Sequence, residues 1–301
     1  MEHQVNRDQA ETLRALSSDF EEKKQIKNKS HKAVRVISVT SGKGGVGKTL
    51  CVANLSVVMA KKGYRVLIID ADLGLANVDL HFGLNPKFNL NHFFAGEKKL
   101  HEILVEARER IKILPAGSGI QKYTHLDSGQ KIHFMEELDL LHDQFDVVLI
   151  DTEAGISENV TYFNLAAQII IVVTTPEPTA LSDAYALMKL LSTRFKEKRF
   201  KLIVNSVVSE NEALDVYHKL TLVSSRFIDI SIDFLGGVPL DKRFTDSVRK
   251  QKTLVELFPK AKSSLAFAEI LENIHLKSEQ QAPKGSMQFF WKNLLNYTDS
   301  H

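Results

Sequence analysis

Apolar runs and amphipathic stretches alternate along most of the chain. Apolar runs, several rich in β-branched residues, occur at 34–40, 65–71, 112–117, 145–152, 168–175, 200–207 and 233–240. Such runs are typical of strands that a sheet buries on both faces. Helical periodicity between them predicts helices at 48–62, about 97–107, 132–141 and 179–194, a helical stretch between the last two strands, and closing helices to 274. The alternation predicts an α/β fold with a doubly wound, mainly parallel sheet and helices on both faces.

The two ends of the chain depart from this alternation. Residues 1–20 carry the pattern of a short amphipathic helix, and 21–33 form a charged linker without an apolar period. A polar linker at 277–286 precedes an apolar segment at 287–301. We therefore expect a core domain at 34–276, with a helix tethered before it and an amphipathic tail after it.

Composition excludes only a few classes of function. The chain has 301 residues and a formal net charge of +2, which gives no global electrostatic reason to expect direct binding of nucleic acid. The single cysteine, Cys51, excludes an intramolecular disulfide and fits a reducing cytoplasm. No signal peptide and no run of about 20 apolar residues, as a membrane-spanning helix needs, is present in the sequence.

A glycine-rich run carries the clearest chemistry. The run SGKGGVGKT at 41–49 contains G-x-x-x-x-G-K-T, and it lies between a predicted strand and a predicted helix, as the motif requires. Glycines allow backbone N–H groups to surround phosphate oxygens, while the lysine places a charge on the terminal phosphates and the threonine hydroxyl ligates Mg²⁺. A purely structural glycine-rich turn is the competing interpretation, which the flanking elements disfavour. The predicted phosphate-binding residues are Gly42, Lys43, Gly44, Gly45, Val46, Gly47, Lys48 and Thr49.

Carboxylates end two of the predicted strands. Asp70 and Asp72 close the second strand, and Asp151 ends the buried run at 145–152. Ligands of doubly wound sheets bind at the carboxyl ends of the strands, so these side chains should face the phosphates. We expect the Thr49 hydroxyl to bind Mg²⁺ and Asp151 to hold the same ion through a water molecule. Asp70, Asp72 and Asp79 could instead only accept loop N–H groups in Asx turns.

The run K-G-G-x-G-K-T at 43–49 resembles the deviant phosphate-binding loop of the MinD/ParA ATPases, a branch of the P-loop NTPases. The resemblance covers about 34–274 and implies ATP or ADP with Mg²⁺ as ligands. It also implies that Lys43 reaches across a homodimer to the partner's nucleotide and takes part in catalysis with Lys48. The competing interpretation of Lys43 is a solvated surface lysine.

Further residues receive roles from the same resemblance. The segment 70–79 matches D-x-D-x-G-x-x-N-x-D, which implies that Asp72 positions the attacking water. Gly155 would sense the γ-phosphate through its backbone N–H. The adenine-binding positions correspond to Asn205, Pro239 and Asp241, although an asparagine ending a strand is also a common loop residue.

Glu153 departs from the family pattern, which usually has a small residue or proline there. A carboxylate near the γ-phosphate would slow turnover, whereas a solvent-facing one would not. In the extreme case, the protein would bind ATP as a scaffold without hydrolysing it.

The N-terminal segment indicates one branch of the family. The run D-Q-A-x-x-L-R at 8–14 resembles a motif of FlhG/FleN-type regulators of flagellar number, and 175–179 followed by 183–187 is similar to a segment of that branch. The resemblance implies that the helix docks on the GTPase FlhF and stimulates GTP hydrolysis. The contacts would come from Asp8, Gln9, Ala10, Leu13 and Arg14. The alternative is a helix that packs on its own core.

The tail has one apolar helical face, formed by Met287, Phe290, Trp291, Leu294 and Leu295. Aromatic residues on a short segment after a linker are typical of a helix that lies in a membrane interface. Few cations accompany it, so two tails of a dimer would bind better than one. Permanent docking on the core is the alternative, and docking in the monomer with release in the dimer is compatible with both.

The resemblance implies a slow, dimer-dependent ATPase in the cytoplasm, reversibly attached to the inner membrane, at the cell pole. Its partners would include FlhF, flagellar switch (C-ring) proteins and a flagellar transcription regulator. The alternatives are a MinD-type ATPase that positions cell division, and a ParA-like partition ATPase that binds DNA.

Overall fold

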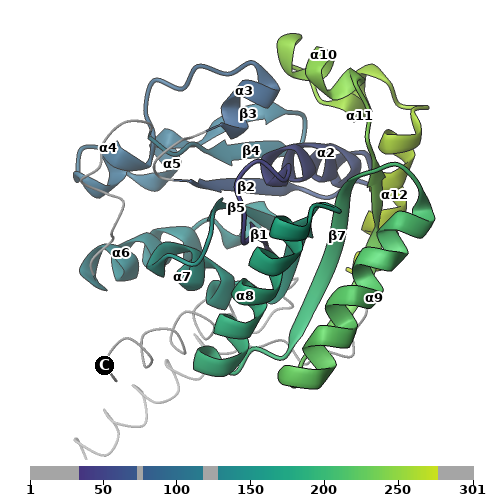
Figure 1. Cartoon of the computed structure of the whole chain (residues 1–301). Coiled ribbons are helices and arrows are strands. Elements are labelled where there is room, and N and C mark those ends of the chain that lie inside the picture. The colour runs from purple at the N-terminus through teal and green to yellow at the C-terminus, as the bar shows by residue number, and fades with distance from the viewer. Residues whose placement is uncertain (1–33, 73–76, 118–127, 277–301) are drawn as a thin grey trace, which may run out of the picture. The chain divides into compact units, whose positions relative to one another are not determined.

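The computed structural model describes residues 34–72, 77–117 and 128–276. The predicted N-terminal helix, both linkers and the tail lie outside the described residues. The described part contains an eight-stranded sheet with the order β3-β4-β2-β5-β1-β6-β7-β8 (Figure 1). The strands are β1 (Arg35–Ser41), β2 (Val66–Ala71), β3 (Val105–Arg108), β4 (Ile111–Leu114), β5 (Val147–Ala154), β6 (Ile169–Thr174), β7 (Arg199–Val207) and β8 (Ser231–Pro239).

Every neighbouring pair in this sheet is parallel except β3 and β4, which are antiparallel. The central strands are apolar on both faces, and the side chains of β2 are all buried. Burial on both faces explains the apolar runs without alternation, because helices must cover each side of a parallel sheet. The doubly wound α/β prediction is confirmed.

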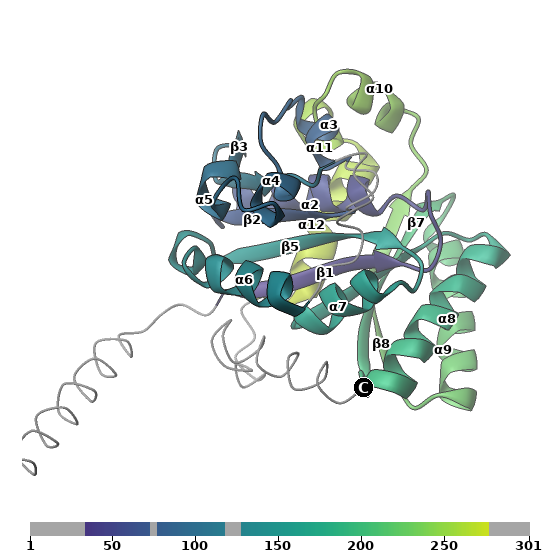
Figure 2. The same ribbon diagram turned by 90° about the vertical axis from the view of Figure 1, so that its left-hand side faces the viewer.

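Helices cover both faces of the sheet, as the two views show (Figures 1 and 2). One face packs against α2 and α12 in a shared core that also includes residues of α3 and α11. The other face packs against α4 to α7 on one side and against α8 and α9 on the other. The helices are α2 (Lys48–Lys61), α3 (Val78–Phe82), α4 (Leu90–Phe94), α5 (Leu100–Ile103), α6 (Ser128–Asp139), α7 (Glu158–Ala166), α8 (Pro178–Phe195), α9 (Glu210–Phe227), α10 (Arg243–Arg249), α11 (Leu254–Leu257) and α12 (Lys262–Ile274), with the 3-10 turn η2 at His142–Gln144. Within the described part of the chain, no helix combines the length and apolar character that crossing a bilayer requires.

The helix predicted at about 97–107 is wrong at both ends. Only 100–103, which form α5, are helical, and residues 105–108 form the edge strand β3. A tight turn follows, in which Arg110 has a φ of 66°, and the chain returns antiparallel as β4. The sequence places no glycine at this turn, so the hairpin lacked its usual signal. Pairing with β4 decided the structure of this segment, because tertiary contacts override weak local preference.

The strand order brings three chain segments together at one edge. β5 lies between β2 and β1, so Asp70 stands opposite Asp151 in the register, and Val39 stands opposite Asp151 on the other side. The loop after β1 leads directly into α2. The carboxyl ends of β1, β2 and β5 therefore bring the glycine-rich loop and the aspartates to one place, as parallel sheets do.

Candidate nucleotide-binding site

The glycine-rich run forms a closely packed loop, which we call the phosphate-binding loop (42–49). Gly45 and Gly47 have φ values of 78° and 94°, a conformation that favours glycine. A Cβ atom on Gly47 would lie 2.2 Å from Asn205 Nδ2, and one on Gly42 would lie 2.1 Å from the carbonyl oxygen of Asp183 in α8. These glycines are therefore required by the close approach of β7 and α8 as well as by the turn.

Lys48 lies buried at the start of α2. Its Nζ donates a hydrogen bond of 2.9 Å to Ser41 Oγ, which donates in turn to the carbonyl oxygen of Lys43 at 2.7 Å. Burial lowers the pKa of Lys48, while the nearby carboxylates of Asp151 and Asp72 oppose this shift. The ammonium group is thus held beside the loop by a hydroxyl and the field of two carboxylates.

Two carboxyl groups are buried side by side behind the loop. Burial, with a contribution from the charge of Asp72, raises the pKa of Asp151 to about 7. A hydrogen bond from Thr49 and the charge of Lys48 act in the opposite direction and lower this pKa, but they do not outweigh burial. Burial and the charge of Asp151 raise the pKa of Asp70 as well. Among the described atoms, Oδ1 of Asp151 has no hydrogen-bond partner. A buried oxygen of this kind, next to the Thr49 hydroxyl, matches the donor set that Mg²⁺ prefers.

Asp70 organises the start of the following loop. Its carboxylate oxygens accept backbone N–H groups of Asp72 at 3.2 Å, Asn77 at 3.2 Å and Val78 at 3.3 Å. These bonds fit the structural role that the sequence suggested for Asp70. They also fix the backbone of Asp72 directly after β2, while 73–76 lie outside the described residues. The role of Asp72 in positioning water stays a prediction.

The segment after β5 contacts the loop through its main chain. Gly155 has a φ of 99°, and its N–H donates to the carbonyl oxygen of Ser41 at 2.9 Å. A contact from this N–H to a phosphate therefore requires the bond to Ser41 to open. The Glu153 carboxylate accepts a hydrogen bond from the hydroxyl of Ser157, which also caps α7 by accepting from the Val160 N–H at 3.2 Å. The Glu153 carboxylate is thus engaged at the start of α7.

The predicted adenine-binding residues lie at the ends of β7 and β8, but two of them have partners within the chain. Asn205 Nδ2 donates to the carbonyl oxygen of Val46 at 2.8 Å. The Asp241 carboxylate accepts hydrogen bonds from Arg243 Nη2 at 2.8 Å and from the Ser263 hydroxyl. The bond from Arg243 has the largest effect, and together the two bonds lower the pKa of Asp241 to about 2. Pro239 ends β8. We expect a base at this edge to meet the main chain of the turn rather than the Asp241 carboxylate.

Lys43 behaves differently from Lys48. Its side chain is 36% exposed, and its Nζ lies 2.6 Å from Glu177 Oε2 and 2.9 Å from Thr179 Oγ1. Sequence reasoning missed these two partners, together with Ser41 and Ser157. The run 175–179 stood out as a motif but carried no assigned chemistry, because the sequence alone did not show that α8 begins beside the loop.

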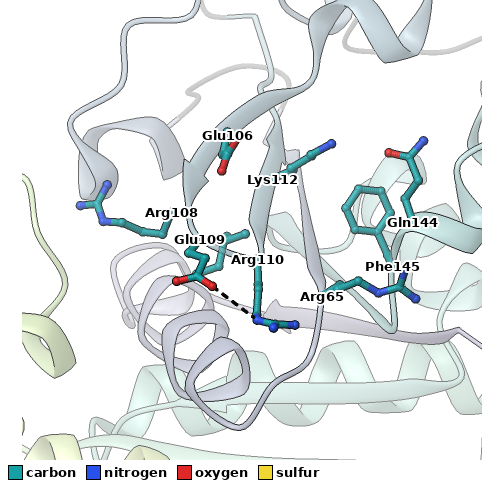
Figure 3. A pocket seen from close by; sticks show the side chains of 9 residues that line it. Arg65, Glu106, Arg108, Glu109, Arg110, Lys112, Gln144 and Phe145 are labelled. Atoms are coloured by element: carbon teal, nitrogen blue, oxygen red, sulfur yellow. Dashed lines mark ion pairs between the residues drawn. The ribbon is translucent and has the colours of Figure 1, made fainter.

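A shallow depression of ≈ 360 Å³ lies at the opposite edge of the sheet, where β2, β4 and β5 begin (Figure 3). It contains none of the predicted site residues. Its lining is formed by Arg65, Glu106, Arg108, Glu109, Arg110, Ile111, Lys112, Gln144 and Phe145.

Known proteins share this fold and much of this sequence. A family described as an AAA domain matches residues 34–204. The antiactivator FleN of Pseudomonas aeruginosa is 39% identical over 264 residues, which cover 88% of this chain and 94% of FleN. The flagellum site-determining protein YlxH of Helicobacter pylori is 34% identical over 268 residues, covering 87% and 90% of the two chains. The septum site-determining protein MinD of Pyrococcus horikoshii, solved with Mg-ADP, superposes with a TM-score of 0.64 at 27% identity over 80% of this chain and 96% of its own. The chain therefore belongs to the MinD/ParA family as a nucleotide-binding ATPase of the group that contains FleN and YlxH.

Proposed function

We propose that this ATPase is a dimerising switch that controls flagellar number or placement. The supporting observation is the unequal placement of two lysines in one loop. Lys48 is buried beside the carboxyl pair, where it serves the chain's own nucleotide, whereas Lys43 lies at the surface. A surface lysine on this loop is placed to contact a nucleotide held by a second copy of the chain.

Each residue of the site has a task in such a cycle. The backbone N–H groups of the phosphate-binding loop and Lys48 bind the phosphates of ATP. Asp72 orients the attacking water, and the Gly155 N–H leaves Ser41 to contact the γ-phosphate. Thr49 and Asp151 would hold Mg²⁺, which neutralises phosphate charge when bound.

The flagellar part of the proposal is supported by the relatives named above, one an antiactivator and the other a flagellum site-determining protein. We propose that the 8–14 segment stimulates the GTPase FlhF, and that the apolar face of 287–295 binds the cytoplasmic membrane. The dimer would present two tails and so strengthen a weak lipid contact. Both segments lie outside the described residues.

Light scattering tests the dimer. The Asp72→Ala chain, in which ATP should persist, is expected to double its mass with ATP and Mg²⁺ and to stay monomeric with ADP. Adding Lys43→Ala should abolish the increase. A monomer in ATP would contradict the switch.

A peptide of residues 1–20 tests the partner. Added to FlhF of the same organism with GTP, it should raise phosphate release, and the Gln9→Ala peptide should not. An inactive peptide, with FlhF shown to be active, would favour a MinD-type ATPase that positions cell division.

Sedimentation with vesicles of anionic lipid tests the tail. The full chain should bind more strongly with ATP than with ADP, and Trp291→Glu should remove this difference because it places a charge on the apolar face. A matched titration with duplex DNA at low salt should stay flat. ATP-dependent, salt-sensitive DNA binding would indicate a partition ATPase instead.

A further inference from the structure

The contact between Lys43 and the start of α8 has no part in the cycle described so far. Nζ of Lys43 uses two of its three N–H donors on Glu177 Oε2 at 2.6 Å and Thr179 Oγ1 at 2.9 Å. Its main chain is fixed as well, because the carbonyl oxygen accepts from Ser41 Oγ at 2.7 Å. The side chain therefore extends from an anchored backbone to a defined pair of acceptors in its own chain.

The fold keeps these acceptors beside the loop. The carbonyl of Asp183 occupies the space that a Cβ on Gly42 would need, so α8 lies directly against the phosphate-binding loop. Pro178 occupies the first turn of α8, with Glu177 at the N-cap position. The distance between Lys43 and Glu177 is thus set by packing between two rigid elements.

The negative charge of Glu177 is what makes the start of α8 favourable for the Lys43 ammonium group. A helix N-terminus carries positive potential, which disfavours a nearby lysine. The Glu177 carboxylate reverses that preference locally. Glu177 makes no side-chain capping bond to α8, so its acidity is not needed to cap the helix.

We propose that Glu177, assisted by Thr179, is an intramolecular counter-ion that holds Lys43 within its own chain and thereby sets how readily ATP drives dimerisation. The inference rests on the proposed function, in which Lys43 contacts the partner's nucleotide. The two contacts exclude each other, because one ammonium group cannot lie against α8 and across the dimer. An exposed ion pair is weak, so a triphosphate can displace it. Glu177 therefore raises the protein concentration that dimerisation in ATP requires, but it does not prevent dimerisation.

Zero-length cross-linking with a carbodiimide tests the contact directly. The reagent joins a lysine to a carboxylate only where the two are in contact, and mass spectrometry identifies the joined peptides. In the Asp72→Ala chain, the Lys43–Glu177 product should form without nucleotide and fall severalfold with ATP and Mg²⁺. The Lys62–Glu272 pair, in which Lys62 follows α2 and Glu272 lies in α12, has its charged atoms 2.7 Å apart and provides a control whose yield should not change. Absence of the Lys43–Glu177 product, or a yield unaffected by ATP in a chain that dimerises, would overturn the proposal.

The Glu177→Gln variant tests the consequence. In the Asp72→Ala background it should lower the protein concentration at half-dimerisation in ATP by about two- to fivefold, the range expected from losing an exposed ion pair. The matched Glu272→Gln variant should not change it. An unchanged or raised midpoint for Glu177→Gln would overturn the proposal.

The Lys43→Ala background separates this inference from the proposed function. If ATP still dimerises the Lys43→Ala chain as well as the parent, Lys43 has no role across the dimer, and both proposals fail. If Lys43 is required but Glu177→Gln has no effect, only the counter-ion proposal fails.

Discussion

The two edges of the sheet differ in how their charged side chains are buried and paired. At the carboxyl edge, Lys48, Asp70 and Asp151 are buried, with the pKa of the lysine lowered and those of the aspartates raised. At the opposite edge, Arg65 lines the depression of Figure 3 and forms an ion pair with Asp146. The side chains of Arg65 and Asp146 are 43% and 11% exposed. Buried groups whose ordinary charge is disfavoured mark the edge that binds a ligand.

At the opposite edge, two arginines form ion pairs and hydrogen bonds with other groups of the chain. Arg65 donates to both carboxylate oxygens of Asp146, at 3.1 and 3.2 Å, and to the carbonyl oxygen of Asp143 at 2.7 Å. Arg108 pairs with Glu256 at 2.6 Å and donates to the carbonyl oxygen of Phe82. These bonds join β3 and the residue before β2 to neighbouring segments, so their role is structural.

Removing the lysine of the carboxyl edge should have the largest effect. Lys48→Ala is expected to weaken ATP binding by about a hundredfold or more, because it removes a charge-assisted contact to phosphate. Titration with a fluorescent ATP analogue measures the loss, and thermal unfolding of the same sample should show a folded chain. Retained affinity would place the nucleotide elsewhere.

The pH dependence of stability should reveal the buried carboxyl pair. In the folded chain Asp151 has a pKa of about 7, whereas in the unfolded chain it loses its proton near pH 4. The folded state therefore binds the extra proton between these values, and stability falls as pH rises from about 4 to 7. Asp151→Asn removes this contribution, so its stability relative to the parent should rise over that range by about 4 kcal/mol, at about 1.4 kcal/mol for each pKa unit.

Urea unfolding of both chains at several pH values, in EDTA and without nucleotide, measures this difference. Asp70 remains in the variant but loses the neighbouring charge of Asp151, so the difference reports the titration of the carboxyl pair. A difference that stays constant with pH would show that Asp151 is ionised normally.

Arg65→Ala should separate stability from binding at the opposite edge. The variant loses a partly exposed ion pair and a bond to a carbonyl oxygen, which predicts a loss of about 1 kcal/mol in the free energy of unfolding. ATP affinity should not change, because the depression lies away from the phosphate-binding loop. A parallel loss of affinity would show that the two edges are coupled.

Glu153→Gln should have the smallest effect. The Glu153 carboxylate is engaged by the Ser157 hydroxyl, so neutralising it should change ATP turnover by less than about threefold. Ser157→Ala, which frees that carboxylate, should slow phosphate release more than Glu153→Gln does. A large acceleration in Glu153→Gln would show instead that Glu153 opposes the γ-phosphate.

Local sequence determined the central strands and the phosphate-binding loop. A strand buried on both faces needs a continuous apolar run, and a phosphate cradle needs glycines followed by lysine and threonine in consecutive positions. Both requirements act over fewer than about ten residues, so they are visible in the chain itself. The same reasoning placed Asp70 and Asp151 at one edge, since each ends a parallel strand.

Tertiary structure decided what those residues contact. The Gly155 N–H meets the carbonyl oxygen of Ser41 only because β5 pairs with β1, and Glu177 meets Lys43 only because α8 packs on the loop. Residues 105–108 became a strand only because β4 was available to pair with them. The partners in the first two contacts are separated by 114 and 134 residues of chain. Local propensity carries no information on such pairs, because the packing of whole elements brings them together.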